Sequence, residues 1–77
     1  MSARQVREQG KKFNRLKAVL ALRDMTAKDL AAKTGYSAQT ISKWNTNREQ
    51  PRLDDLFLMA EVLNVNPCEL IEYTPLK

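Results

Sequence analysis

From residue 13 onward, apolar residues recur at helical spacing and are separated by short polar segments. A first helix is expected from Asn14, which can cap it, to about Arg23. The inward face of this helix is expected to consist of Leu16, Val19 and Leu20. No run of alternating β-branched residues occurs, so the pattern predicts no strands. The pattern therefore favours an all-α fold.

Three further helix starts share one device, an N-cap residue flanked by two apolar residues five positions apart. The N-caps are Thr26, Ser37 and Asn66, and the last is followed by Pro67 at the first helical position. The apolar pairs are, in the same order, Met25 with Leu30, Tyr36 with Ile41, and Val65 with Leu70. Such a cap accepts a hydrogen bond from a free backbone N–H, and the apolar pair fixes the entry of the chain.

One more helix is expected between the second and third of these starts, from about Leu53 to Leu63 after Pro51. Its inward stripe is expected to consist of Leu53, Leu56, Met59, Ala60 and Leu63. The pattern therefore predicts five helices in all.

The first 12 residues differ from the rest because they contain one large internal aliphatic residue, Val6. They cannot bury a face, so we interpret residues 1–12 as a flexible basic arm. A frayed extra helix is the alternative. Residues 13–77 are expected to form one domain. A chain this short buries only about 60% of its unfolded surface, so nearly every periodic apolar residue is needed in the core.

The net charge of +4 conceals an uneven distribution along the chain. Residues 1–52 carry twelve Lys and Arg against four Asp and Glu, whereas residues 53–77 carry one Lys against five acidic residues. This segregation favours a polyanionic partner on one face of the protein. Ordinary solvated charge is the alternative, and it explains so clean a separation less well.

The inventory of reactive side chains argues against an enzyme. The chain has no histidine and one cysteine, Cys68, which removes most metal sites and most general acid–base chemistry near neutral pH. No phosphate-binding glycine loop or nucleophile motif occurs, so we expect no metal, cofactor or small-molecule substrate. Cys68 is expected to be half-buried in a reducing compartment. Without a membrane-length apolar run or a signal peptide, the expected location is cytoplasmic, with no membrane partner.

Residues 26–44 have the pattern of two short helices joined by a tight turn. Gly35 follows the first helix, where the chain must take a left-handed conformation that glycine adopts at little cost. The facing sides of the two helices are expected to carry Leu30, Ala31, Ile41 and Trp44. We interpret Trp44 as core rather than as a base-stacking platform. This arrangement is typical of a helix-turn-helix, whose second helix, here about residues 38–45, lies in the major groove of DNA.

The outward face of that second helix carries side chains suited to DNA bases, namely Ala38, Gln39, Ser42 and Lys43. The Gln39 amide can bond an adenine edge, Lys43 can reach O6 or N7 of guanine, and Ala38 can contact a thymine methyl. A solvated surface pair is the alternative interpretation of Gln39 and Lys43.

A second set of polar residues is placed to contact phosphates. Two of them, Thr26 and Ser37, lie at helix N-termini, whose free N–H groups attract anions. The expected backbone contacts are Thr26, Lys28, Ser37, Thr40, Asn45, Thr46, Asn47 and Arg48, with Arg52 close behind. The arm can follow the backbone or enter a minor groove through Arg4, Arg7, Lys11 and Lys12. A solubilising tail is the alternative for the arm.

These residues resemble the Cro and phage-repressor type of helix-turn-helix, the XRE family of bacterial and phage regulators. The resemblance extends from about Asn14 to Ile71. It is carried by Met25-Thr26 with Leu30-Ala31 and Gly35, by Thr40 to Trp44, by Pro51 to Leu56, by Met59 to Val65 and by Glu69 to Ile71. It implies a five-helix, lambda-repressor-like domain whose helices 2 and 3 form the helix-turn-helix. It also implies a nucleoid-associated transcriptional repressor that binds operator DNA as a two-fold homodimer.

The chain departs from the family pattern at several positions. Ala27 stands where many members carry a glutamine that clamps a phosphate, so that clamp is not expected here. Leu20 and Asn45 replace an Arg–Glu pair, and because both partners are absent, no charge is left unpaired. In the turn after the recognition helix, Asn47 replaces a glycine and can adopt the left-handed conformation.

A protein-binding module, such as an antitoxin or adaptor, is the alternative function. Several apolar residues lie off the inward stripes or near the end of the chain, namely Phe57, Leu58, Val62, Ile71, Tyr73 and Leu76. Surplus apolar surface of this kind can mark an interface. The same residues also suit a homodimer, or the completion of a small core.

Overall fold

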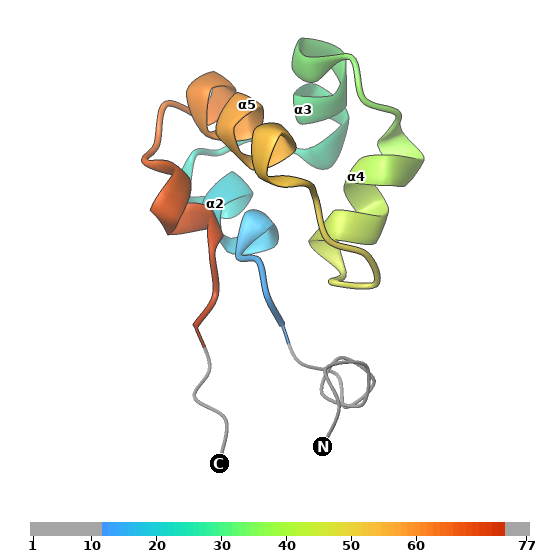
Figure 1. The fold of residues 1–77 in the computed structure, drawn as a ribbon. Helices are drawn as coiled ribbons and strands as arrows, with labels where there is room; N and C mark the ends of the chain where they lie inside the picture. Colours follow the sequence, from blue (N-terminus) through green and yellow to red (C-terminus); the bar gives the residue numbers. More distant parts are fainter. Residues whose placement is uncertain (1–11, 74–77) are drawn as a thin grey trace.

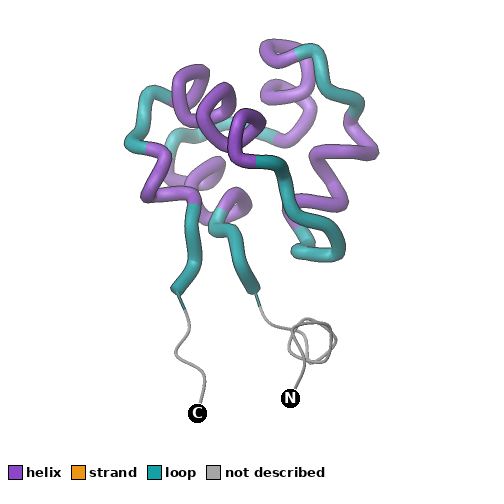
Figure 2. Tube along the Cα trace, in the orientation of Figure 1, coloured by secondary structure: helices purple, strands orange, loops and turns teal. Residues whose placement is uncertain are grey.

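A computed structural model describes residues 12–73, which form four α-helices and one 3-10 helix (Figure 1). In chain order they are α2 (Leu16–Leu22), α3 (Ala27–Thr34), α4 (Ala38–Asn45), α5 (Leu53–Leu63) and η1 (Pro67–Leu70). Residues 12–73 contain no strand, only one isolated bridge between Asn14 and Ile71 (Figure 2). The predicted all-α fold is confirmed. Residues 1–11, which are most of the predicted arm, and residues 74–77, which include Leu76, lie outside the described part.

The expected fifth α-helix is a single turn of 3-10 helix, so the count of five helices is not confirmed. The backbone is already extended at Ile71, where φ is −106° and ψ is 130°. Here the chain pairs with the segment before α2. The N–H of Arg15 donates to the carbonyl of Leu70 at 2.9 Å, and the N–H of Glu72 donates to that of Phe13 at 3.0 Å. These bonds hold the chain extended and end the helix after four residues.

The core lies where all five elements meet. Each element contributes one large side chain that is at most 1% exposed, and these are Leu16, Leu30, Ile41, Met59 and Leu70. The cluster is completed by Val19, Leu20, Trp44, Ala60 and Leu63. The core predicted from helical spacing is therefore confirmed at nearly every position, including the assignment of Trp44 to the interior.

Two burial predictions are wrong. Leu53, expected in the inward stripe of α5, is 68% exposed because it is the first residue of the helix, one turn ahead of Leu56, which packs on the core. Cys68, expected to be half-buried, is exposed, since the short η1 turns Leu70 inward instead. Helical spacing gives the direction of a side chain and not whether another element covers it.

The predicted caps of α3 and α4 are confirmed. The Thr26 hydroxyl accepts from the N–H of Asp29 at 3.0 Å, and the Asp29 carboxylate accepts from the N–H of Thr26 at 3.1 Å. The Ser37 hydroxyl likewise accepts from the N–H of Thr40 at 3.0 Å. These caps fix where the two helices of the helix-turn-helix begin.

The predicted cap of η1 is confirmed, and that of α2 is wrong by one residue. Asn66 caps η1 as predicted, accepting from the N–H of Cys68 at 2.9 Å. At α2 the prediction is off by one residue, because the N-cap is Arg15, which makes no side-chain cap bond. Asn14 still accepts from the N–H of Leu16 at 3.0 Å, but its position is set by partners outside the helix.

Candidate nucleic-acid interface

The turn between α3 and α4 has the geometry that the sequence predicts. Gly35 has a φ of 87°, in the left-handed region, and its N–H donates to the carbonyl of Ala31 at 2.9 Å. A Cβ built on Gly35 meets nothing within 4 Å. Glycine is therefore needed here for its backbone conformation and not for space. Leu30 and Ile41 are completely buried on the facing sides of the two helices, which sets the angle of α4 against the core.

The outer face of α4 carries three exposed side chains, Ala38, Gln39 and Ser42. Lys43, the fourth predicted base contact, is partly covered and lies 3.5 Å from the Glu49 carboxylate. Both side chains are substantially exposed, at 37% and 61%. A solvent-exposed pair of this kind contributes little to stability, so Lys43 can leave Glu49 when a better anion is present. Glu49 was not identified from the sequence as a neighbour of this face.

The start of α4 carries two of the predicted backbone contacts. Ser37 is exposed, and its hydroxyl donates to the hydroxyl oxygen of Thr40 at 2.9 Å. Thr40 is half-buried beneath it. The two hydroxyls therefore lie together where α4 begins, beside backbone N–H groups that have no helical partner.

The N-terminus of α3 is less open to an anion than its sequence suggests. The Asp29 carboxylate accepts from the N–H of Thr26 at 3.1 Å, and the backbone and then the side chain of Thr26 lower the pKa of the Asp29 carboxyl. A carboxylate thus already stands at this helix end. Lys28, which is exposed, supplies an opposite charge next to it. Of the predicted contacts here, Lys28 is therefore the one best placed to meet a phosphate.

The loop after α4 divides its predicted contacts between surface and interior. Arg48 and Thr46 are exposed. Asn47 has the predicted left-handed backbone, with a φ of 60°, but its side chain is used inside the protein. Its Oδ1 accepts from the N–H groups of Phe13 at 2.8 Å and Asn14 at 3.1 Å. Its Nδ2 donates to the Asn14 carbonyl at 3.2 Å. Asn47 thus positions the loop rather than offering its side chain to a ligand.

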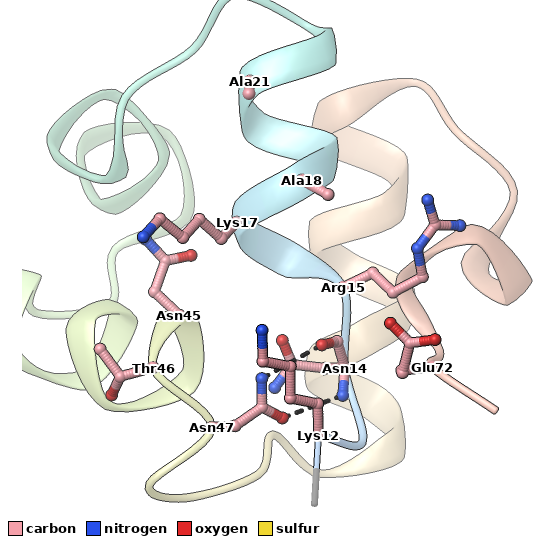
Figure 3. Close-up of a pocket in the computed structure, with 10 residues that line it drawn as sticks. All are labelled: Lys12, Asn14, Arg15, Lys17, Ala18, Ala21, Asn45, Thr46, Asn47 and Glu72. Atoms are coloured by element: carbon pink, nitrogen blue, oxygen red, sulfur yellow. Dashed lines mark hydrogen bonds between the residues drawn. The ribbon is translucent and has the colours of Figure 1, made fainter. Parts of the chain in front are cut away.

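Asn14 is the centre of this network, and the sequence gives no signal of that role. Asn14 is buried, with 4% of its surface exposed. Its Nδ2 donates to the carbonyl of Trp44 at 2.9 Å and to the Gln50 amide oxygen at 2.8 Å (Figure 3 shows Asn14 bonded to Asn47). The segment before α2 is therefore tied to the C-terminal end of α4.

A second tie holds the turn itself against α5. The Tyr36 hydroxyl donates to the Asp55 carboxylate at 2.6 Å. The Tyr36 ring meets the Trp44 ring edge to face, with centroids 5.0 Å apart and planes at 78°. Burial, followed by the bond to Asp55, raises the pKa of Tyr36 to about 12. Sequence reasoning identified Tyr36 as a staple residue and missed this bond.

Leu20 and Asn45, which stand at the positions of the family's Arg–Glu pair, differ in their surroundings. Leu20 is 4% exposed within the core. Asn45 is half-buried, and its Oδ1 is a buried acceptor without a hydrogen-bond partner among the described residues.

Residues 12–73 hold no cluster of His, Cys, Asp or Glu that suits a metal ion. Within the same range, no helix has the length and apolar character needed to cross a membrane.

Comparison with known proteins agrees with this geometry. Residues 15–75 match the family model of the Cro/C1-type HTH DNA-binding domain. The fold is similar to a crystal structure of a protein from Bacteroides fragilis that is provisionally described as DNA-binding, with 48% sequence identity and a TM-score of 0.76. That match covers 78% of this chain and 97% of the other. No curated protein matches the chain. The family match spans most of the sequence and includes every described helix, so the chain belongs to the Cro/C1-type HTH DNA-binding domain family.

Proposed function

We propose that this protein is a sequence-specific regulator of transcription, a repressor, that inserts α4 into the major groove of double-stranded DNA. The observation that carries the proposal is the two-sided character of α4. Ile41 and Trp44 anchor its inner face, at 0% and 6% exposure. Gln39 and Ser42 are exposed on its outer face. A rigidly held helix that presents an amide and hydroxyl outward is suited to reading base edges.

Sequence reading is assigned to Ala38, Gln39, Ser42 and Lys43. Gln39 has the chemistry for an adenine edge and Lys43 that for guanine, once Lys43 leaves Glu49. The charge-neutral Ala38 and Ser42 leave room for close approach of a thymine methyl or either base edge. The expected result of this set is discrimination of about 1–3 kcal/mol for each well-made contact.

Contacts to the DNA backbone are assigned to polar and basic residues of α3, α4 and the loop that follows α4. These are Thr26, Lys28, Ser37, Thr40, Asn45, Thr46 and Arg48. Asn47 contributes by holding the loop in place. From the arm, Lys12 lies beside the loop that follows α4 (Figure 3), and Arg4, Arg7 and Lys11, which lie outside the described residues, are assigned to the backbone by their charge. Phosphate contacts of this kind position the protein and carry no sequence information.

We propose further that the protein binds DNA as a homodimer. Leu53 and Phe57 are four residues apart on one side of α5 and are 68% and 56% exposed. Exposed apolar side chains so placed favour a protein partner over solvent. A second copy fits the two-fold operators that helix-turn-helix dimers read. An antitoxin or adaptor with a different protein partner is the second candidate, and it rests on the same apolar residues.

Selection of the purified protein on a random duplex library tests the proposal. Enrichment of an inverted repeat with half-sites about one helical turn apart supports a dimeric, site-reading regulator. Enrichment of a single half-site supports site reading by a monomer. A library that stays unselected at modest salt contradicts sequence-specific binding and favours the antitoxin or adaptor.

A further inference from the structure

We propose that a groove between α2 and the C-terminal end of α4 binds a phosphate of the DNA backbone, outside the surface that α4 offers to the bases. This inference rests on the proposed function and extends it. The groove has a volume of about 490 Å³ (Figure 3). It is lined by Lys12, Asn14, Arg15, Lys17, Ala18, Ala21, Asn45, Thr46, Asn47 and Glu72.

The charge around the groove favours an anion. Lys12, Arg15 and Lys17 line it together with a single carboxylate, that of Glu72. The ion pairs found within residues 12–73 are Lys43 with Glu49 and Arg52 with Asp54, so none of the three groove cations is paired with a described carboxylate. The described lining of the groove therefore carries three cations against one carboxylate and has a net positive charge.

The wall of the groove contains an unused polar group. The Oδ1 of Asn45 is buried and has no hydrogen-bond partner among the described residues. Figure 3 shows the Lys17 side chain extending toward Asn45 from the opposite wall. A buried polar atom without a partner is unfavourable, and such atoms are rare in folded proteins. Because Asn45 also lines the groove, its NH₂ group is the part of the amide that can donate, together with Lys17, to an anion there.

The floor of the groove leaves room for a tetrahedral group. Ala18 and Ala21 lie on the exposed side of α2 and project only a methyl group each. Asn47 and Asn14 are held in their network on the adjoining wall, so that wall is fixed before any ligand arrives. A preformed site of this kind loses little conformational freedom on binding.

The position of the groove identifies the source of the phosphate. Asn45 and Thr46 line the groove and also end α4, so the groove begins where the proposed base-reading helix stops. A duplex that holds α4 in its major groove presents phosphates along both edges of that groove. The strand that passes the C-terminal end of α4 would place a phosphate over Lys17. Lys12, the described residue of the predicted arm, lines the same groove and adds a second cation for that phosphate.

The test compares two single-charge variants on the site selected by the wild-type protein. Lys17→Gln removes a groove cation, and Lys33→Gln removes an exposed cation of α3 that lies outside the groove and outside the proposed interface. Phosphate-ethylation interference locates the contacted phosphates. The expected result is that Lys17→Gln loses interference at one phosphate flanking the half-site, whereas Lys33→Gln keeps the full pattern. Affinity should fall roughly tenfold for Lys17→Gln, and the salt slope by about one unit.

Two results overturn the groove assignment while leaving the proposed function intact. In the first, the wild type still selects its site, and Lys17→Gln and Lys33→Gln show the same affinity and the same interference pattern. The loss of charge at Lys17 then has no local effect. In the second, NMR signals of Lys17 and Asn45 shift with inorganic pyrophosphate and the shift persists in the DNA complex, which identifies a site for a small phosphorylated molecule. Failure of the wild type to select any site instead contradicts the proposed function itself.

Discussion

Tyr36 and Asp55 join the turn of the helix-turn-helix to α5 through a 2.6 Å hydrogen bond from phenol to carboxylate. The two residues are 19 positions apart in the chain. Asp55 also accepts from the N–H of Arg52 at 3.0 Å, so the same carboxylate begins α5 and holds the turn. This bond, together with the contact of Tyr36 on Trp44, fixes the direction in which α4 leaves the turn.

Replacement Tyr36→Phe should lower the free energy of unfolding by about 1–2 kcal/mol, because the ring contact stays and the bond to a charged acceptor is lost. Asp55 keeps its bond from Arg52, so its carboxylate is not left alone. Urea denaturation, with an unchanged m-value, is the measurement. A variant as stable as the wild type would mean that the bond contributes nothing in water.

The stability supplied by Tyr36 should depend on alkaline pH. Its pKa is raised from 10.0 to about 12, so the folded state holds the phenolic proton more tightly than the unfolded chain. The contribution is therefore fully present below pH 10 and is lost as the pH rises from 10 to 12. The stability difference between wild type and Tyr36→Phe should shrink over that range. A difference that stays constant contradicts the assigned cause.

Asn47 is expected to serve in two separable ways. Asn47→Gly keeps the backbone at its φ of 60° but removes the side-chain bonds to Phe13 and Asn14, and should destabilise the fold by about 1–3 kcal/mol. Asn47→Ala removes the same bonds and adds left-handed strain of about 1–2 kcal/mol. Thermal and urea unfolding of the pair give the comparison. Equal stability of the two variants would show that the backbone conformation carries no strain for alanine.

Much of the fold is predictable because its signals are local. The capping residues Thr26 and Ser37 and the turn glycine Gly35 each act within a few positions of themselves. The fourth predicted helix, Leu53–Leu63, has the same bounds in the structure. Short-range hydrogen bonds and helical spacing decide these features, and both are visible in the sequence.

The rest of the site depends on contacts between distant segments. Asn14 meets Asn47 and Gln50 across separations of 33 and 36 residues, and no spacing rule indicates that pairing. The exposure of Leu53 likewise depends on which element lies opposite, whereas the pairing of Lys43 with Glu49 depends on how the loop after α4 turns back on that helix. The groove between α2 and α4 has the same origin, since it exists only once the two helices are placed side by side.

The proposed dimer predicts that Phe57→Lys separates site reading from assembly. Phe57 is 56% exposed, so the monomer fold should survive the change. Leu22→Lys, at an apolar residue of α2 that is 76% exposed, is the matched control. On an inverted repeat, sedimentation should find two copies of wild type and of Leu22→Lys. Phe57→Lys should fill the half-sites independently and more weakly. Unchanged pairing of Phe57→Lys would place the dimer interface elsewhere, and a single bound copy of wild type would contradict the dimer.

The reading of sequence by the outer face of α4 is tested most directly by repeating the duplex selection with Gln39→Ala. Gln39 is exposed and lies outside the described hydrogen-bond networks, so the fold should be unaffected. We expect the selected motif to keep its half-site spacing and to lose its preference at one position in each half-site, with a cost of about 1–3 kcal/mol on the wild-type site. Lys33→Gln should return the wild-type motif. A Gln39→Ala motif identical to that of the wild type would contradict base reading by Gln39 on α4.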